Sequence, residues 1–356
     1  MKWLRADPWL LGSVLFLIVA GLAVQASISS QLFVRQLVWV AIALIIIFAL
    51  PRLNLRAAFS YRWVILGIYL GVLALLIFTY FVAPAVRGHR SWIDFGSFQI
   101  QPSEFMKAAL IVLFSRFFAL RHISIAHWGT IAVSFIYFVV PTVFVLLQPD
   151  TGTALVLFVI WFGYLLVSEI PWRHLIAFFL AFAVVGALAW NFGLANYQKE
   201  RIRGLFNPSY EPLGINYNVI QAKIAVGSAG IFGKGFEQGT QVQLGFLPAA
   251  ATDFAFSAFT EEWGLLGATL LIAAFLLLIY RILRIGIAAE DNFSRFICIG
   301  TAIFILTHLI INFGSNLGVL PVIGIGLPLV SYGGSNLLTA AVLIGIIQNI
   351  AGRAAF

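Results

Sequence analysis

Three carboxylates stand within ten residues at the start of a long apolar segment: Asp253, Glu261 and Glu262. Asp253 lies between Thr252 and Phe254. A carboxylate among aromatic residues at a membrane boundary is costly and usually has a functional reason. Asp253 is therefore a candidate general base, a group that takes a proton from a reacting hydroxyl. The alternative is that Asp253 only caps the helix that begins there, since aspartate is common at helix N-caps.

A second candidate group spans residues 90–107 and contains Arg90, Trp92, Glu104 and Lys107. Glu104 and Lys107 are three residues apart on one helix face, so their side chains can pair. One interpretation is an exposed interfacial ion pair, of the kind that contributes little to stability, with Trp92 anchored among lipid headgroups. The other is a lysine that holds a substrate phosphate and is oriented by the glutamate.

Two shorter polar stretches complete the set. Asp150 lies in Gln148-Pro-Asp-Thr-Gly-Thr153, between two apolar runs. The stretch reads either as a turn with an aspartate cap or as irregular backbone that lines a cavity. Arg201 and Arg203, with Lys223 and Lys234, bring positive charge to a long loop. They bind lipid headgroups in one interpretation and a substrate phosphate in the other.

The composition is that of a polytopic membrane protein. The chain has 356 residues, of which 62% are hydrophobic and only 10% charged, and its mean hydropathy is +1.02. The net charge of +8 follows from the excess of cations on the inner side of membrane proteins, so nucleic acid is not an expected partner. The single Cys298 excludes an intramolecular disulfide, and no His/Cys cluster has metal-ligand spacing.

The apolar pattern predicts an all-α fold with about ten transmembrane helices in a single unit, residues 1–356. A large extracytoplasmic loop, about 193–261, joins helices 7 and 8, and amphipathic helices are expected within it. Prolines and glycines between Asn312 and Asn336 predict a re-entrant segment between helices 9 and 10. The helices are expected near 9–27, 33–50, 63–83, 105–121, 129–148, 152–168, 174–192, 262–283, 295–313 and 334–352.

The basic residues predict the orientation in the membrane. With the N-terminus inside, most of the Arg and Lys residues near helix ends fall on the inner side, so both termini are expected in the cytoplasm. Nine of the 13 acidic residues then fall outside. Carboxylates have little influence on topology, so their concentration on one face indicates a working surface there.

Seven short motifs, in order along the chain, resemble one known family. They are Gln101-Pro-Ser-Glu-Phe-x-Lys107, Gln148-Pro-Asp-x-Gly-Thr153, Gly233-Lys-Gly235, Gly239-Thr-Gln241, Leu247-Pro248 with Thr252-Asp-Phe254, Glu261-Glu-x-Gly264 and Leu327-Pro-x-x-Ser-Tyr-Gly-Gly334. The chain is similar to the SEDS proteins (shape, elongation, division and sporulation), and more similar to the RodA kind than to the FtsW kind. Each motif is weak alone, but together they are highly specific.

The resemblance implies a peptidoglycan glycosyltransferase of the bacterial cytoplasmic (inner) membrane. Such proteins polymerise the lipid-linked precursor lipid II on the outer face, in cell elongation and shape maintenance, beside a class B penicillin-binding protein. The essential aspartate of the family falls on Asp253, and other important positions fall on Trp92, Glu104, Lys107 and Asp150. The family is also thought to use a divalent cation, Mg²⁺ or Mn²⁺, for which the sequence reveals no ligand set.

The sequence also departs from the family pattern. Ala249 and Ala251 stand where the family often has Glu and His, and Ser91 replaces a basic residue, so Arg90 is expected to serve instead. Two other function classes remain open. A lipid II flippase would also have many helices, a broken segment and charge within the membrane. A scaffold that only recruits a crosslinking enzyme would tolerate changes at Asp253.

Overall fold

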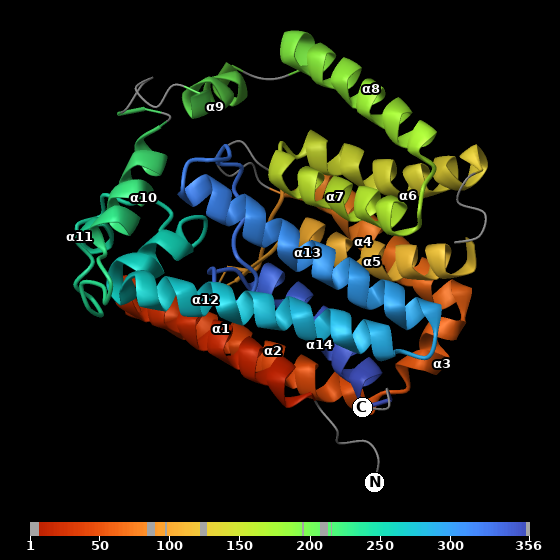
Figure 1. Ribbon diagram of the computed structural model, residues 1–356, viewed down its shortest axis with the longest axis horizontal. Coiled ribbons are helices and arrows are strands. Elements are labelled where there is room, and N and C mark those ends of the chain that lie inside the picture. Colours follow the sequence, from red (N-terminus) through yellow and green to blue (C-terminus); the bar gives the residue numbers. More distant parts are fainter. Residues whose placement is uncertain are drawn as a thin grey trace.

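The computed structural model describes residues 7–83, 90–96, 98–121, 127–193, 196–206, 213–214 and 216–353. The described chain is almost entirely α-helical (Figure 1). The long helices are α1 (Pro8–Ile28), α2 (Ser30–Ala49), α4 (Arg62–Val82), α5 (Pro102–Arg121), α6 (Trp128–Leu147), α7 (Thr151–Val167), α8 (Trp172–Leu188), α12 (Ala255–Ala288), α13 (Asn292–Asn316) and α14 (Gly334–Ala351).

The fold class is confirmed, and each predicted helix has a counterpart near its expected place. Eight helices of the described chain are long and apolar enough to cross a membrane. The other two are α7, which has 17 residues, and α5, which carries Glu104, Lys107, Arg116 and Arg121. The count of ten spans therefore stays a prediction for these two helices.

Short elements join the long helices. They are a 3₁₀ turn, η1 (Leu50–Arg52), the helix α3 (Leu55–Ser60), a hairpin of β1 (Ile93–Asp94) and β2 (Gln99–Ile100), a π-helical turn, η3 (Ala189–Gly193), and the loop helices α9 (Asn196–Phe206), α10 (Tyr217–Ser228) and α11 (Thr240–Gln243). The hairpin was not predicted. Its two strands pair antiparallel, Ile93 opposite Ile100, and lead directly into α5.

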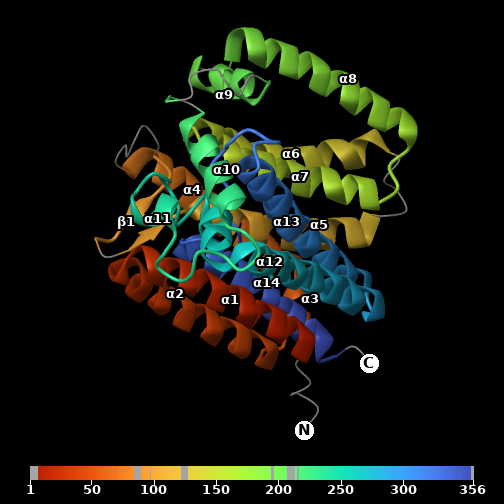
Figure 2. The same ribbon diagram turned by 60° about the vertical axis from the view of Figure 1, so that its left-hand side comes forward.

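The helices differ sharply in how deeply they lie within the bundle. In the apolar 18-residue stretch of each helix, 83% of the residues are buried in α14 and 67% in α13, whereas none of the described residues is buried in that stretch of α8. Figure 1 and Figure 2 both show α8 along the outer edge, beyond α6 and α7. Helices α13 and α14 therefore lie at the centre of the bundle.

Polar contacts tie α1 to α12 at both ends. At one end, the Asp7 carboxylate pairs with the guanidinium of Arg281; at the other, the Ser27 hydroxyl donates to Glu262. The backbone N–H of Asp7 also donates to Gln348 Oε1 at 3.0 Å. The first residues of α1 and the last turn of α14 therefore lie at the same end of the bundle.

The expected start of helix 8 at residue 262 is wrong. Helix α12 begins at Ala255, and Gly264 kinks it with a φ of +71°, a conformation that glycine adopts without steric cost. A Cβ at Gly264 would lie 2.2 Å from the Gly233 backbone nitrogen. The residue 230–235 turn bonds across the kink, with Lys234 N–H donating to Glu261 O and Leu265 N–H to Gly230 O. Apolar periodicity missed the first turns because they are buried in protein rather than lipid.

Irregular backbone joins α13 to α14 over residues 317–333, where the re-entrant segment was expected. Leu327, Leu329 and Val330 are buried. The Tyr332 N–H donates to Ala251 O at 2.8 Å, and Ser331 Oγ donates to Thr252 O at 2.6 Å. The segment therefore packs directly against the loop that carries Asp253.

Candidate active site

Asp253 lies in the loop just before α12, and it does not cap that helix. The N-cap position is Phe254, and no side chain caps the helix there. The capping interpretation is therefore wrong by one residue. The carboxylate instead faces the irregular segment, where a Cβ on Gly324 would stand 3.9 Å from Asp253 Oδ2.

Two asparagines of α13 fix the backbone at Asp253. Asn312 Nδ2 donates to the Asp253 carbonyl oxygen at 2.9 Å, and Asn316 Nδ2 donates to the same oxygen at 3.0 Å. The Asn316 Oδ1 atom accepts from the Ser257 hydroxyl at 2.6 Å, which ties the arrangement to the first turn of α12. Asn312 also donates to Ile325 O at 2.8 Å. One helix therefore holds both the loop and the segment facing it.

Burial raises the pKa of the Asp253 carboxyl above its usual value. A hydrogen bond from Thr252 and then the positive charge of Arg201 act in the opposite direction and lower it. A raised pKa makes the carboxylate more basic, which suits a group that must accept a proton near neutral pH.

Lys107 belongs to a buried chain of polar groups. Its Nζ lies 2.7 Å from Glu104 Oε1 and 3.3 Å from His308 Nε2. The His308 Nδ1 lies 2.8 Å from Gly326 O, so Nδ1 carries the proton and Nε2 accepts from the lysine. The pairing predicted for Glu104 and Lys107 is confirmed.

The burial of this pair contradicts one of the two interpretations offered by the sequence. Lys107 is 1% exposed and Glu104 7% exposed, so the pair is not an exposed interfacial one. Lys107 reaches the Gly326 carbonyl through His308. The substrate-binding roles of Lys107 and Glu104 stay predictions.

Asp150 anchors the start of α7. Its Oδ1 accepts from Thr153 N–H at 2.9 Å, and its Oδ2 accepts from Gln101 Nε2 at 2.9 Å. The aspartate cap is therefore present. The same turn also touches the irregular segment, because a Cβ on Gly152 would stand 2.4 Å from Ile323 O. Asp150 thus lies near the segment that faces Asp253.

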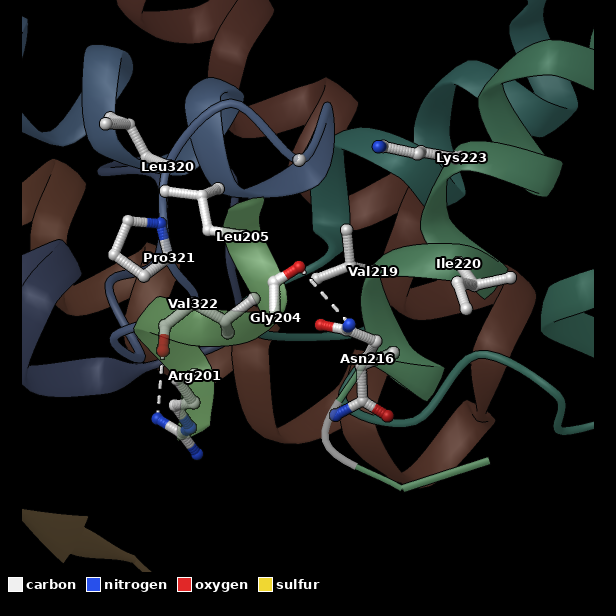
Figure 3. Close-up of a pocket in the computed structure, with 12 residues that line it drawn as sticks. Arg201, Gly204, Leu205, Asn216, Val219, Ile220, Lys223, Leu320, Pro321 and Val322 are labelled. Atoms are coloured by element: carbon white, nitrogen blue, oxygen red, sulfur yellow. Dashed lines mark hydrogen bonds between the residues drawn. The ribbon is translucent and has the colours of Figure 1, made fainter. Parts of the chain in front are cut away.

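An open pocket of about 620 Å³ lies between α9, α10 and the start of the irregular segment (Figure 3). Arg201 and Lys223 provide its cations. Arg201 Nη1 donates to Val322 O at 2.9 Å, two residues before Gly324, so the arginine connects this pocket with Asp253. The lining is Arg201, Gly204, Leu205, Asn216, Asn218, Val219, Ile220, Lys223, Gly318, Leu320, Pro321 and Val322.

Three predicted residues remain, and they differ in exposure. Arg203 and Arg90 are exposed and Trp92 is half-buried. Ser91, between Arg90 and Trp92, donates to Gln148 O at 3.2 Å. This hydrogen bond holds the residues just before β1 beside the turn that contains Asp150. Within the described part of the chain, no hydrogen bond or ion pair joins Arg203 or Trp92 to Asp253, so their substrate-binding roles stay predictions.

Sequence reasoning missed His308 and Asn316 as functional residues. Together with Asn312 they are spaced four residues apart along α13, so they share one helix face. That polar face in an apolar helix is the signal that identifies them. Arg201 was predicted, but the pocket that it shares with Lys223 was not.

Metal ligands are sparse around Asp253. Among the described residues, no three His, Cys, Asp or Glu side chains come together to hold an ion. A magnesium ion commonly takes one or two carboxylates together with substrate phosphates. The donor set at Asp253 fits that arrangement only with substrate present.

The model of a family of cell cycle proteins named for FtsW, RodA and SpoVE matches residues 3–355. This chain belongs to the FtsW/RodA/SpoVE family. The resemblance to SEDS proteins drawn from the motifs is therefore confirmed.

Relatives and solved structures of the FtsW/RodA/SpoVE family agree over nearly the whole chain. Peptidoglycan glycosyltransferase MrdB of Escherichia coli (strain K12) is 33% identical over 347 residues, or 97% of this chain and 93% of that protein. Stage V sporulation protein E of Bacillus subtilis (strain 168) is 33% identical over 328 residues, or 89% of this chain and 86% of that protein.

Two solved structures share the fold. The crystal structure of the rod shape determining protein RodA of Thermus thermophilus has a TM-score of 0.74 and 27% identity, and the match covers all of both chains. A chain of a peptidoglycan synthase complex, described as coordinating polymerization and crosslinking, has a TM-score of 0.83 and 31% identity over 98% of both chains.

Proposed function

We propose that this protein is a peptidoglycan glycosyltransferase that polymerises lipid II into glycan strands, in cell elongation and shape maintenance, with Asp253 as the general base. The observation that carries the proposal is the setting of Asp253, a carboxylate with a raised pKa on backbone fixed by Asn312 and Asn316. The MrdB relatives, named as peptidoglycan glycosyltransferases, support the same activity.

In the proposed step, a sugar hydroxyl of the acceptor attacks the anomeric carbon of the donor. The proton of that hydroxyl passes to Asp253, and the bond between the anomeric carbon and the lipid pyrophosphate breaks. The donor bond is axial and the polymer bond equatorial in the family chemistry, so a single inverting displacement is enough. One base serves such a displacement, whereas retention requires a second carboxylate as nucleophile.

Arg201 is the cation best placed to stabilise the departing pyrophosphate, because its charge already acts on Asp253. Lys223 in the same pocket (Figure 3) adds to the positive potential, and the exposed Arg203 and Arg90 add further positive charge. Charges fixed in a site of low dielectric act more strongly than they would in water. Lys107 contributes through His308, which holds the segment facing the base.

A divalent cation, Mg²⁺ or Mn²⁺, would neutralise charge on the pyrophosphate when bound. The substrate phosphates would hold it, which leaves Asp253 free to take the proton.

The protein is a multi-pass membrane protein, and we place it in the cytoplasmic membrane with both termini in the cytoplasm and Asp253 on the outer side. We also propose a class B penicillin-binding protein as its partner. The matched chain in a peptidoglycan synthase complex supports this pairing. Extracytoplasmic placement of Asp253 fits substrates that are crosslinked outside the cell.

The test is polymerisation by the purified protein with lipid II, its partner and a divalent cation. Asp253→Ala and Asp253→Asn should slow polymerisation by a factor of about 10² to 10⁴. Glu237 is an exposed acid of the same loop, and the Glu237→Gln variant should polymerise lipid II at the normal rate. Normal glycan synthesis by a folded Asp253→Ala variant would show that Asp253 is not the general base. A parallel assay of fluorescent lipid II transport in liposomes separates the flippase alternative, which predicts transport without polymerisation.

A further inference from the structure

A second open pocket, of about 600 Å³, lies at the end of the bundle opposite Asp253. Its walls come from α3, α5, the start of α13 and the end of α14. In Figure 1, α3 lies at the far end of the bundle from α10 and α11. Ser294 in this pocket and Asn316 beside Asp253 stand near the two ends of α13, about 33 Å apart at the rise of an α-helix.

Three guanidinium groups face one carboxylate in this pocket. The cations are Arg56, Arg116 and Arg353, and the anion is Asp291. Both oxygens of Asp291 already accept from Ser294, one from its N–H and one from its hydroxyl, each at 2.9 Å. The exposed Arg56 also pairs with Glu290 at 3.4 Å. A net positive charge remains on Arg116 and Arg353, which are less exposed than Arg56.

Of these two arginines, Arg116 has an unused hydrogen-bond donor and Arg353 carries a desolvated charge. Arg116 donates from Nη2 to Ser60 O at 3.3 Å, while its Nε is buried and has no hydrogen-bond partner among the described residues. Burial lowers the pKa of Arg353, and among its neighbours Asp291 raises the pKa while Arg56 lowers it further. An anion placed between these groups would satisfy the free donor and offset the desolvation.

We propose that this pocket binds the phosphodiester headgroup of an anionic phospholipid of the inner leaflet. Guanidinium groups suit phosphate oxygens because their planar donors match the oxygen geometry. The apolar walls, which include Phe59, Phe293 and Ile350, suit the glycerol and first acyl carbons beside the phosphate. Basic pockets between membrane helices on the cytoplasmic side bind such headgroups. The site is remote from Asp253, so the proposal does not depend on the catalytic role of Asp253; it rests only on the proposed orientation, which puts this end of the bundle in the cytoplasmic leaflet.

The test measures lipid binding by the full-length purified protein, with short-chain phosphatidylglycerol, short-chain phosphatidylcholine and inorganic phosphate as three separate probes. The proposal expects phosphatidylglycerol to bind tightest. Arg116→Gln should weaken that binding about tenfold or more, because a charge-assisted hydrogen bond is lost. Arg284→Gln is the matched control, since it removes an exposed charge from α12 outside this pocket and should leave binding unchanged.

Asp291→Asn provides a gain that damage to the fold would not mimic. Asparagine still caps α13, but the pocket loses its carboxylate, so phosphatidylglycerol should bind several-fold tighter. Equal affinity for phosphatidylcholine, unchanged binding in Arg116→Gln, or an equal loss in Arg284→Gln would each overturn the proposal. Binding of inorganic phosphate as tight as that of phosphatidylglycerol would also overturn it, because the lipid portion would then contribute nothing.

Discussion

Asp253 and Glu261 are carboxylates eight residues apart in sequence, yet their surroundings differ in kind. Glu261 is fully buried and accepts from Lys234 Nζ at 2.7 Å, from the Thr240 hydroxyl and from the N–H groups of Gln241 and Val242. Asp253 has the hydroxyl of Thr252 and the more distant charge of Arg201.

The difference separates a structural acid from a reactive one. A buried carboxylate with an ammonium partner and several hydrogen-bond donors holds together the segments that carry those donors. Glu261 therefore fastens the 234–242 loop to the first turns of α12. At Asp253 the protein fixes the backbone through Asn312 and Asn316 and leaves the carboxylate with little stabilisation. Rigid backbone with a poorly stabilised charge is what a general base requires.

Replacing each acid by its amide should give the largest effects, and they should differ in kind: one variant loses activity and the other loses stability. Asp253→Asn should slow polymerisation by a factor of about 10² to 10⁴ without loss of stability. Glu261→Gln should lower the free energy of unfolding by about 3 kcal/mol or more, because it leaves the partly buried Lys234 unpaired. Activity per folded molecule and unfolding in detergent micelles, measured for both variants, check this. A folded, stable but inactive Glu261→Gln would contradict the structural role.

Removing the support beneath Asp253 should give the next largest effect. Asn316→Ala deletes the donor to the Asp253 carbonyl and the acceptor for Ser257. We expect kcat to fall about 10²-fold, since small displacements of a catalytic group are costly, with an unchanged KM for lipid II. Ser315→Ala is the control, because its hydroxyl donates only to Asn312 O. A rise in KM with normal kcat would show that Asn316 acts on substrate binding instead.

Neutralising the pocket arginine should have a smaller effect, of a different kind. Arg201→Gln removes a charge from the candidate pyrophosphate pocket, and we expect kcat/KM to fall about tenfold, as for one charge-assisted hydrogen bond. Lys199→Gln on the same helix is the matched control. Equal losses in both variants would indicate a general effect of loop charge rather than a defined contact.

The smallest effect concerns pH. Because the folded state raises the pKa of Asp253, it holds the proton more tightly than the unfolded state does. Wild-type stability should therefore fall as pH rises from the unfolded pKa to the folded pKa. Asp253→Asn lacks this loss, so its Tm should slightly exceed that of the wild type at pH 7 and approach it at low pH. Thermal unfolding of both proteins across this range measures the difference. A wild-type Tm higher than the variant's at pH 7 would contradict the raised pKa.

Much of the fold could be predicted because hydrophobic length and turn residues are local properties. The positions of the long helices, the irregular segment before Gly334 and the pairing of Glu104 with Lys107 follow from spacing along the chain. The start of α12 could not be predicted, since Ala255–Glu262 are buried by other parts of the protein. The unpredicted hairpin consists of two-residue strands, too short for a periodic signal.

By itself, the sequence determined that Asp253 is the acid to suspect, that the chain spans a membrane, and that its motifs are those of one family. Only the tertiary structure decided that Lys107 is buried against His308, that Phe254 rather than Asp253 occupies the N-cap, and that Asn316 holds the loop. The physical reason is that charge type and helix spacing are fixed by neighbours in sequence. Burial and hydrogen-bond partners are fixed by residues far apart in the chain.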